Sequence, residues 1–348
     1  MGLQDERDGF AVQGNALGAV VVNFNTSTET LECIASLLRL GTRIDRIIVV
    51  DNASAESDRR ALRVGIEHYD ATVFLVEAQE NLGFSGGCNL GIARLLELAN
   101  IQRVLLLNSD ALAYPAMSGW LDTQSADIAG ATVVKAGGGG EVDSRGIVMY
   151  SSALASNRQG LEEPLLGPTG GCAIYSRRFL EHVQHVHGYI FDPDFFCYAE
   201  DTDLAARAIL LGYVPEHCDD VVAEHIGQVS SGGGFNGFVL YHGIRNSIWV
   251  GLKCFPLWSL LKRAPFILAL HIGICMRHGS SGQLRTLLRL YFDALRGMPR
   301  MLRKRRAIQK ARVASIRDFE QRISRRFYEP RYVRQAVREL MGARETKR

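Results

Sequence analysis

The sequence lacks any paired cysteine motif. Its seven cysteines are scattered, odd in number and never spaced as C-x-x-C. Disulfide frameworks and structural zinc sites depend on regular cysteine spacing, so neither is expected. We predict reduced thiols and a chain that works in a reducing compartment, the cytoplasm.

Long apolar runs are also missing. Residues 1–15 mix acidic, basic and small residues where a secretory signal would be apolar, so we expect a flexible N-terminus and no export. Residues 264–276 form the most apolar stretch, yet a helix that spans a bilayer needs about 20 apolar residues. They predict a buried helix. The alternative is an interfacial helix, since Trp249, Trp258 and basic neighbours flank them.

Charge is unevenly spread along the 348 residues. Residues 277–348 hold 21 Lys and Arg against 6 Asp and Glu, while the whole chain has a net charge of +3. This basic segment can face an anionic membrane surface, or it can be a solvated arm that packs on the rest of the chain or on a second subunit of a homo-oligomer. We expect no nucleic-acid partner, because no recognisable binding module accompanies the charge.

What the sequence does contain is a repeated strand–helix pattern. Short apolar, β-branched runs at 16–23, 46–50, 72–76 and 103–107 predict buried parallel strands. Helical spacing of apolar residues at 28–40, 57–69 and 86–99 separates them, which favours an α/β fold. Further on, we expect loops at 136–140 and 151–168, a helix at 200–211, short strands near Tyr213 and at 221–223, a lid or linker at 227–237, and helices from residue 238.

Polar side chains follow each predicted strand. Asn23 and Asn25 follow the first strand, Asp51 the second, Asn81 and Gly83 the third, and Asn108 and Asp110 the fourth. In open α/β sheets the ligand binds beyond the carboxyl ends of the strands, so these segments should converge on one site. Asp51 can accept hydrogen bonds from a base or a ribose, although a lone aspartate there is often a turn cap.

The usual dinucleotide fingerprint G-x-G-x-x-G is absent after the first strand, which argues against a hydride-transfer enzyme. Glycines instead gather at 81–91, where a strand leads into a helix. Free N–H groups at such a helix start suit an anion, and close packing of the turn on the sheet explains the glycines equally well.

Acidic residues supply the remaining chemistry. Asn108 and Asp110 can hold Mg²⁺ or Mn²⁺ between the protein and a diphosphate. Glu200, Asp201 and Asp203 begin a helix after an aromatic run, where helix-dipole stabilisation accounts for acids, and where desolvation can also prepare a general base. His225 follows a strand and is either a loop histidine or a metal ligand.

In this order, these segments resemble the inverting nucleotide-sugar glycosyltransferases of family 2, which have the GT-A fold. The resemblance covers about residues 17–250 and rests on stretches 21–25, 50–54, 81–91, 106–110, 170–173 and 191–204 and on His225. Within the family, the stretch 241–246 (YHGIRN) is most similar to the rhamnosyltransferase type.

The resemblance implies a mixed, mostly parallel sheet flanked by helices. It implies a catalytic domain at 16–250, with a nucleotide half at 16–110 and an acceptor half at 111–250, followed by a basic helical region at 251–348. The usual D-x-D motif is here Asn108-x-Asp110, so metal binding is weaker or rests on Asp110, His225 and the diphosphate.

The resemblance also implies roles for single residues. Asp51 reads the nucleobase, Asn81 and Gly83 line the nucleotide, and Asp110 holds the metal, which His225 completes. Asp201, beside Glu200, deprotonates the acceptor hydroxyl. The expected function is transfer of a sugar, rhamnose from dTDP-rhamnose first, to a saccharide or a lipid-linked saccharide at the inner face of the membrane. The alternative is a degenerate, non-catalytic module that binds nucleotide or polysaccharide.

Overall fold

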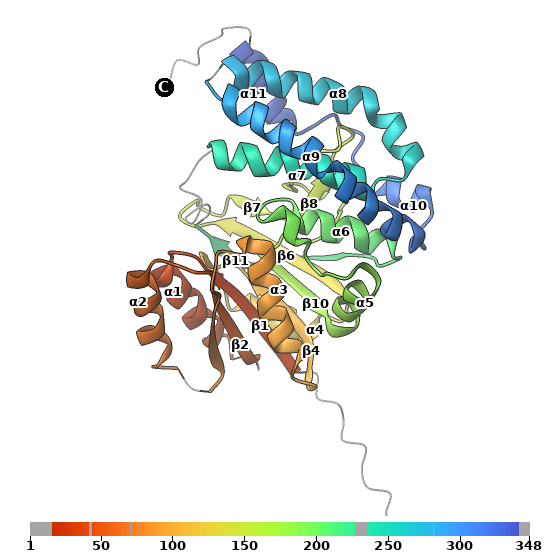
Figure 1. Cartoon of the computed structure of the whole chain (residues 1–348). Coiled ribbons are helices and arrows are strands. Elements are labelled where there is room, and N and C mark those ends of the chain that lie inside the picture. The colour runs from red at the N-terminus through yellow and green to blue at the C-terminus, as the bar shows by residue number, and fades with distance from the viewer. Residues whose placement is uncertain (1–15, 42–43, 70, 227–235, 281, 341–348) are drawn as a thin grey trace, which may run out of the picture.

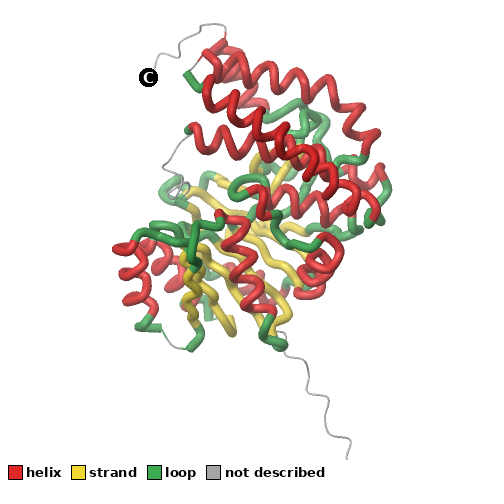
Figure 2. Tube along the Cα trace, viewed as in Figure 1, coloured by secondary structure: helices red, strands yellow, loops and turns green. Residues whose placement is uncertain are grey.

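A computed structural model describes residues 16–41, 44–69, 71–226, 236–280 and 282–340. The predicted flexible N-terminus and most of the predicted lid at 227–237 lie outside these residues. The described chain forms a layered α/β domain with a stack of helices at one end (Figure 1). Figure 2 shows the same division, with the strands gathered in the lower part and helices above them.

The N-terminal half alternates strands and helices as the apolar pattern predicts. Its elements are β1 (Ala16–Asn23), α1 (Ser27–Leu38), β2 (Ile44–Asp51), α2 (Glu56–Ile66), β3 (Val73–Glu77), α3 (Gly83–Leu96) and β4 (Ile101–Leu107). These strands pair in parallel, β3 with β2, β2 with β1 and β1 with β4. Their carboxyl ends therefore meet at one edge of the sheet.

The next elements complete the sheet with mixed pairings. They are β5 (Ala111–Ala113), α4 (Ala116–Thr123), β6 (Ile128–Lys135), β7 (Val142–Ser144), β8 (Ile147–Met149), β9 (Ala155–Asn157), β10 (Cys172–Ser176), α5 (Arg177–His187), the short 3₁₀ helix η1 (Pro193–Phe195), α6 (Glu200–Leu210) and β11 (Glu216–His225). The main sheet has the order β3-β2-β1-β4-β10-β6-β11-β5, with β7 on β6. Strand β10 runs antiparallel between β4 and β6, which gives the predicted mixed sheet.

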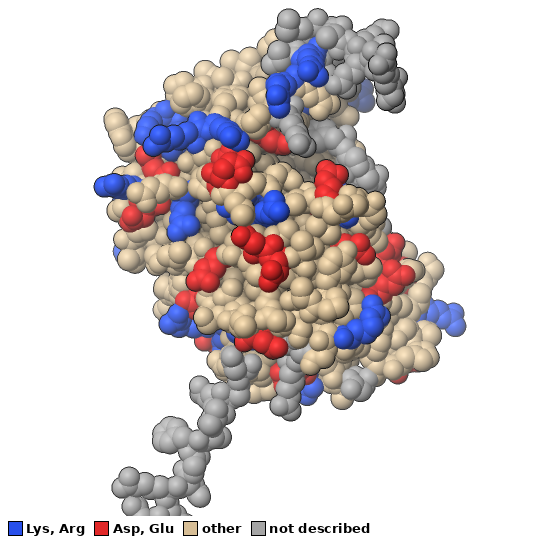
Figure 3. Space-filling view, turned by 180° about the vertical axis from the view of Figure 1, so that it is seen from behind, with Lys and Arg blue, Asp and Glu red and all other residues tan. Residues whose placement is uncertain are grey.

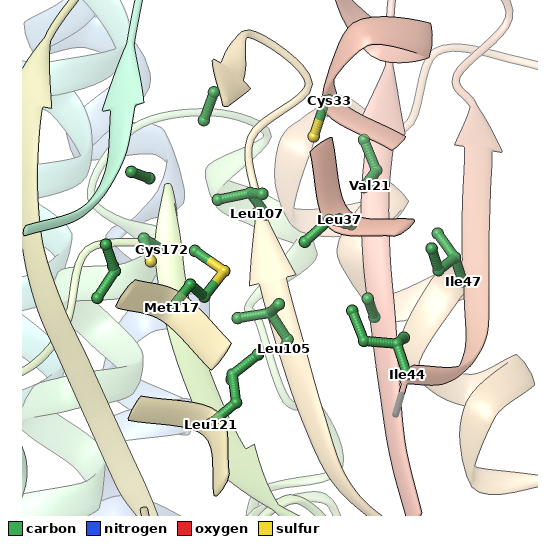
Figure 4. Packing of buried hydrophobic residues seen from close by; sticks show 14 of the residues in the cluster. Val21, Cys33, Leu37, Ile44, Ile47, Leu105, Leu107, Met117, Leu121 and Cys172 are labelled. Carbon is green, nitrogen blue, oxygen red and sulfur yellow. The ribbon is translucent and has the colours of Figure 1, made fainter. Parts of the chain in front are cut away.

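Each face of the sheet has its own apolar core, because successive side chains of a strand point to opposite faces. Val21 of β1 and Leu105 and Leu107 of β4 pack against Cys33 and Leu37 of α1 (Figure 4). Their strand neighbours point the other way, towards α3, α5 and α6. Both faces are covered, which is why the strands read as continuous apolar runs.

The glycines of stretch 81–91 lie mostly inside α3, which begins at Gly83 rather than at residue 86. A Cβ added at Gly87 would lie 2.8 Å from Val22, and one added at Gly91 would lie 2.4 Å from Val20. These two glycines therefore let the helix approach β1 closely, and the packing explanation holds for them.

The C-terminal part is helical, as predicted. It comprises α7 (Gly237–Cys254), α8 (Leu257–Ser280), α9 (Leu284–Lys310), α10 (Ile316–Gln321) and α11 (Pro330–Leu340). Buried side chains of α7, α9 and α10, such as Val250, Met301 and Phe319, pack on α6. Since α7 runs through residue 250, the predicted boundary there falls inside a helix.

Three local predictions were wrong. Tyr213 lies in the irregular segment after α6 and not in a strand, and one long strand, β11, follows it. The predicted loop at 151–168 includes β9, which pairs with β8. The stretch 264–276 belongs to the longer helix α8, whose outward apolar side chains are exposed; only 22% of its most apolar window is buried. Neighbouring helices cover only one side of α8, and a sequence does not show this.

By length and composition, α8 is the one helix among the described residues that is apolar enough to cross a membrane, over 257–279. The sequence-based estimate that this stretch is too short counted only its central 13 residues. A single helix of this kind also occurs in proteins that are not inserted in membranes, so the finding is weak evidence by itself.

Candidate functional site

The ends of β1 and β2 are joined by a buried polar network centred on Asn23. The Asn23 amide nitrogen lies 2.9 Å from Asp51 Oδ1, 2.9 Å from Asp58 Oδ2 and 3.0 Å from Ser54 Oγ. Its carbonyl oxygen accepts a hydrogen bond from Thr30 Oγ1 at 2.8 Å. Asn23 is fully buried, so it organises the loop at the sheet edge instead of offering free groups to a ligand.

Asp51 ends β2 where the sequence predicts it, but its carboxylate already has partners within the chain. It is fully buried, accepts from Asn23, and pairs with Arg59 Nε at 3.3 Å. Asn25, by contrast, is exposed and adopts a positive φ of 57°. Its side chain accepts from the Ala55 N–H at 2.7 Å, which fixes the turn between β2 and α2.

Asn81 and Gly83 shape the turn before α3. Asn81 Oδ1 accepts from the Gly83 N–H at 2.9 Å and from the Asn52 amide at 3.1 Å. Gly83 has a φ of +68°, and a Cβ there would lie 2.2 Å from the carbonyl oxygen of Phe196. Only glycine fits this position, because the loop that precedes α6 passes directly over it.

A histidine between two carboxylates lies beyond β4 and β11. His225 Nε2 is 3.0 Å from Asp110 Oδ1, and His225 Nδ1 is 3.0 Å from Asp143 Oδ2. The Asn108 amide nitrogen lies 3.3 Å from the same Nε2. Burial alone would lower the pKa of His225, but the hydrogen bonds to Asp110 and Asp143 raise it to about 9.

Asp110 and His225, predicted as metal ligands, therefore face each other. No group of three or more His, Cys, Asp or Glu side chains within the described ranges is arranged to hold a metal ion. The two residues fit a cation that takes its other ligands from a substrate diphosphate, the usual mode for Mg²⁺ at phosphates. Asp143 fits the role of an outer partner that orients the imidazole. No sequence pattern pointed to Asp143, which follows a glycine run and belongs to no motif.

The acids at the start of α6 follow a loop with unusual backbone geometry. Phe196, Tyr198 and Ala199 have φ values of 65°, 68° and 63°. The Asn246 amide nitrogen of α7 is within hydrogen-bond distance of the carbonyl oxygens of residues 195, 197 and 198, at 2.7 to 3.0 Å. Arg245 adds a bond to Phe195 O at 3.1 Å. The stretch YHGIRN thus stabilises the strained loop before α6, and this loop sets the position of the acids at the start of that helix.

Asp201 is held by the backbone of two segments. Its Oδ2 accepts from the Gly170 N–H at 2.9 Å, and its Oδ1 accepts from the Thr202 N–H at 2.6 Å. Burial raises the pKa of Asp201, and these hydrogen bonds oppose the rise. Burial, with the adjacent Asp201 charge, raises the pKa of Glu200 well above its usual range. Glu200 Oε2 is buried and has no hydrogen-bond partner in the described part of the chain.

Asp203 has a different environment, although it is only two residues away. It is fully buried between Arg207 Nε at 2.8 Å and Lys253 Nζ at 2.7 Å. Burial alone would raise the pKa of Asp203, but the two cations hold it at about 2. Lys253 also pairs with Asp192, which Lys304 of α9 contacts in turn. Asp203 therefore has a structural part in an ion-pair network and does not fit the role of a base.

The predicted site residues divide into two groups around a cavity of about 290 Å³, here called the acid cavity. The residues that line it come from β4, β11 and α6: Asn108, Asp110, His225, Glu200 and Asp201. Val22, Phe84, Asp143 and Tyr198 also line it. Asn23, Asn25, Asp51, Asn81 and Gly83 do not, and lie in the loops beside it. The structure brings together the predicted metal ligands, Asp110 and His225, and the predicted base, Asp201, which lies 91 residues after Asp110 in the sequence.

Comparisons with known proteins agree with this architecture. Residues 19–184 match the model of the family named glycosyl transferase family 2. A comparison with curated proteins gave no match. Among solved structures, the chain is similar to S. aureus TarS residues 1–349 in complex with UDP-GlcNAc, with a TM-score of 0.53 and 15% identity over 87% of this chain and 89% of that chain.

Two further structures are similar to this chain. S. aureus TarS has a TM-score of 0.52 and 14% identity, over 87% of this chain and 54% of that chain. The mannosyltransferase PcManGT from Pyrobaculum calidifontis, in complex with GDP-Man and Mn²⁺, has a TM-score of 0.47 and 17% identity over 86% of each chain. At these identities the likeness concerns the fold and not the chemistry of the site. Residues 19–184 are therefore similar to glycosyl transferase family 2, and the chain has the GT-A fold.

Proposed function

We propose that the chain transfers a sugar from a nucleoside-diphosphate donor to an acceptor hydroxyl, with inversion at the anomeric carbon. One observation carries the proposal: Asp110 and His225 line the same cavity as Glu200 and Asp201. A single displacement needs a group that binds the diphosphate and a base that deprotonates the acceptor hydroxyl. Both must lie within reach of one sugar ring.

Asp201 is the proposed base. The N–H groups of Gly170 and Thr202 fix the orientation of its carboxylate, so the lone pairs that remain can accept the acceptor proton. Burial raises the pKa of Glu200 well above its usual range, whereas hydrogen bonds from Gly170 and Thr202 oppose the rise in the pKa of Asp201, so we assign the negative charge of the pair to Asp201. As the hydroxyl attacks, its proton passes to Asp201 and the nucleoside diphosphate departs.

Asp110 and His225 are the residues that would hold Mg²⁺ or Mn²⁺, together with oxygens of the diphosphate. Such a cation supplies charge stabilisation to the departing diphosphate. Asn108 contributes an amide in place of a second carboxylate, so the site carries less negative charge than a D-x-D pair. Asp143 would orient the imidazole of His225 through its contact with Nδ1, the ring nitrogen that does not face Asp110.

The donor sugar is a separate question. The stretch YHGIRN, which resembles the rhamnosyltransferase type, leads us to propose dTDP-rhamnose as the first donor to test. In this structure the stretch supports the loop before α6 through Arg245 and Asn246. We keep the prediction that the nucleotide binds beside Asn23, Asn25, Asp51, Asn81 and Gly83. Asp51 would have to give up its present partners in order to hydrogen-bond a nucleobase.

A screen of nucleotide sugars for thermal stabilisation, with and without Mg²⁺ or Mn²⁺, tests the proposal. A ligand that binds only the folded state raises its apparent stability, by about 2.7 kcal/mol at 100 times its Kd. Transfer of the sugar to a saccharide acceptor, with inversion at the anomeric carbon seen by NMR, would support the proposed activity. Stabilisation without any transfer or donor hydrolysis would instead support the non-catalytic binding module.

We further propose that the enzyme sits on the inner face of an anionic membrane. Helices α8 and α9 each expose a stripe of large apolar side chains, namely Leu257, Leu261, Leu268, Ile272 and Met276 on α8 and Leu284, Leu288, Leu295 and Leu302 on α9. Exposed arginines flank the stripe on α9: Arg285, Arg289, Arg296, Arg303 and Arg306. Seen from behind, positive side chains gather towards the upper end of the molecule (Figure 3). Apolar stripes beside basic residues are typical of interfacial helices.

Not all of the basic region is available for lipid. Arg300 and Lys304 pair with Asp194. Arg305 donates to the carbonyl oxygens of residues 252 and 255. For these three residues the packed-arm alternative holds.

Co-sedimentation with anionic and neutral vesicles tests the membrane proposal. The double variant Leu268→Gln/Ile272→Gln should bind anionic vesicles at least about tenfold more weakly, and wild-type binding should fall with salt. The matched control Val64→Gln replaces an exposed valine of the sheet domain. Equal binding by all three proteins would contradict the proposal. Truncation after Phe255 is unsuitable, because it removes the buried Met301 and Ile308 from the core.

A further inference from the structure

Three neighbouring cavities run from the acids into the helical stack. A second cavity of about 300 Å³, the middle cavity, shares Asn157, Tyr198, Glu200 and Asp201 with the acid cavity. A third of about 220 Å³, the apolar cavity, shares Leu154, Ile244, Ser247 and Leu270 with the middle cavity. Because the middle cavity shares wall residues with each of the other two, the three lie in a series from Asp110 to the side of α8 that carries Ile267 and Leu270.

The chemistry of the walls changes along this series. The acid cavity has carboxylates and His225. The middle cavity keeps only Glu200 and Asp201 as acids, among apolar side chains, tyrosines, small polar side chains and His278. No described residue that lines the apolar cavity is an aspartate, glutamate, lysine or arginine. Its one titratable group, His271, has its pKa lowered by burial and is therefore uncharged near neutral pH.

Helix α8 forms one wall of the two inner cavities. Leu270 lines both, Ile274 lines the middle cavity and Ile267 lines the apolar cavity. The opposite side of the same helix exposes Leu268 and Ile272, at 63% and 51% of their surface. Helix α8 therefore has an apolar surface on its outer side and an apolar cavity on its inner side. A lipid that passes from a bilayer into the protein would stay in contact with apolar side chains.

We propose that the middle and apolar cavities bind a lipid-linked acceptor, with its polar head at Glu200 and Asp201 and its hydrocarbon chain under α8. The inference rests on the proposed transfer reaction, whose acceptor it assigns to one chemical class. Most hydroxyl groups of a water-soluble saccharide would find no hydrogen-bond partner in the apolar cavity. A hydrocarbon chain matches its walls, and every methylene that enters it adds to the affinity.

Two glycines of α7 line the cavities. A larger side chain at either position would fill the cavity beside it without a change in the helix. A Cβ at Gly251, which lines the apolar cavity, would meet no atom within 4 Å, and the same holds for Gly243 in the middle cavity. Leucine is also a better helix former than glycine, so Gly251→Leu should fold. Gly119→Leu is the matched control, since Gly119 lies exposed in α4 with equally open space.

The experiment uses the full chain and calorimetric binding of n-decyl β-D-glucoside and ethyl β-D-glucoside, both below micelle-forming concentrations. The head group is the same in the two probes. We expect the decyl probe to bind at least about tenfold more tightly than the ethyl probe, because several methylenes leave water. Gly251→Leu should remove that advantage, and Gly119→Leu should keep it. Ser247→Leu, in the wall that both inner cavities share, is the second variant should Gly251→Leu fail to fold.

Equal affinity for the two probes in the wild type would overturn the inference, and so would a decyl advantage that survives both filling variants. The nucleotide-sugar screen separates this failure from failure of the proposed function. Donor stabilisation together with equal probe affinities contradicts only the lipid site. A decyl advantage that Gly251→Leu removes supports the lipid site, even where no nucleotide sugar stabilises the chain.

Discussion

Two sets of acids lie close together in this molecule and have opposite environments. The cavity acids, Asp110, Glu200 and Asp201, face a space of about 290 Å³. The network acids, Asp192 and Asp203, lie fully buried among lysines and arginines. Burial raises the pKa of Glu200 and Asp201, whereas cations lower the pKa of Asp203 to about 2. Charge partners, and not residue type or sequence position, therefore divide reactive acids from structural ones.

The largest effect should come from Asp201→Asn. The variant keeps one acceptor oxygen for the two N–H groups of Gly170 and Thr202 and cannot take up a proton, so turnover should fall by about 10² to 10⁴. Stabilisation by the nucleotide sugar should stay near the wild-type value, because Asp201 is not placed on the nucleotide. Turnover close to that of the wild type would show that Asp201 is not the base and would direct attention to Glu200.

Asp203→Asn should affect stability and not chemistry. It leaves Arg207 and Lys253 buried with one carboxylate fewer, which should cost about 3 to 5 kcal/mol in denaturant unfolding. Asp194→Asn, at the more exposed rim of the same network, should cost about 1 kcal/mol or less. A similar cost for both variants would contradict the contrast drawn between network and rim.

The stability difference between wild type and Asp203→Asn should also depend on pH. Asp203 has a lowered pKa, so its contribution is present above the unfolded value near 3.9 and is lost as the pH falls towards about 2. Unfolding curves between pH 5 and pH 2 measure this. A difference that stays constant over the range would argue against the ion pairs as its origin.

Asp110→Ala should weaken the nucleotide-sugar complex mainly when Mg²⁺ or Mn²⁺ is present, by roughly 10-fold to 100-fold, since a site with few protein ligands depends on each of them. Titration of the donor with metal and with a chelator measures the two affinities. Asp127→Asn is a control on an aspartate outside the acid cavity that pairs with Arg178. Equal loss with and without metal would restrict Asp110 to hydrogen bonding.

The smallest effect is expected from Glu200→Gln on stability. The raised pKa of Glu200 means that its contribution is present below the unfolded value near 4.3 and is lost as the pH rises through the folded value. The variant should therefore be more stable than the wild type at neutral pH, and increasingly so as the pH rises. Lower stability of the variant at pH 8 would contradict the desolvated state assigned to Glu200.

The sequence predicted the order of the first four strands and the elements between them. Buried strands form apolar runs of five to eight residues, which local patterns reveal directly. The sites at strand ends followed from the same pattern, since parallel strands bring their carboxyl ends to one edge. The motif spacing also pointed to Asp110, His225, Glu200 and Asp201, which do line one cavity.

Local sequence patterns did not separate Asp201 from Asp203, which only the family resemblance did, and they did not separate Asn23 from a ligand-binding residue. Both distinctions depend on partners far away in the chain, such as Lys253 for Asp203 and Asp58 for Asn23. Asp143 was missed for the same reason, because its contact with His225 joins residues 82 positions apart.

Sequence alone determined the fold class, the family resemblance and the residue types available at the sheet edge, because these depend on local periodicity and on short motifs. Tertiary structure decided which acids are neutralised, why Gly83 must be glycine beneath Phe196, and which side of α8 is covered. These outcomes depend on the distance and burial of groups from separate elements, and packing sets both only when the helices and the sheet come together.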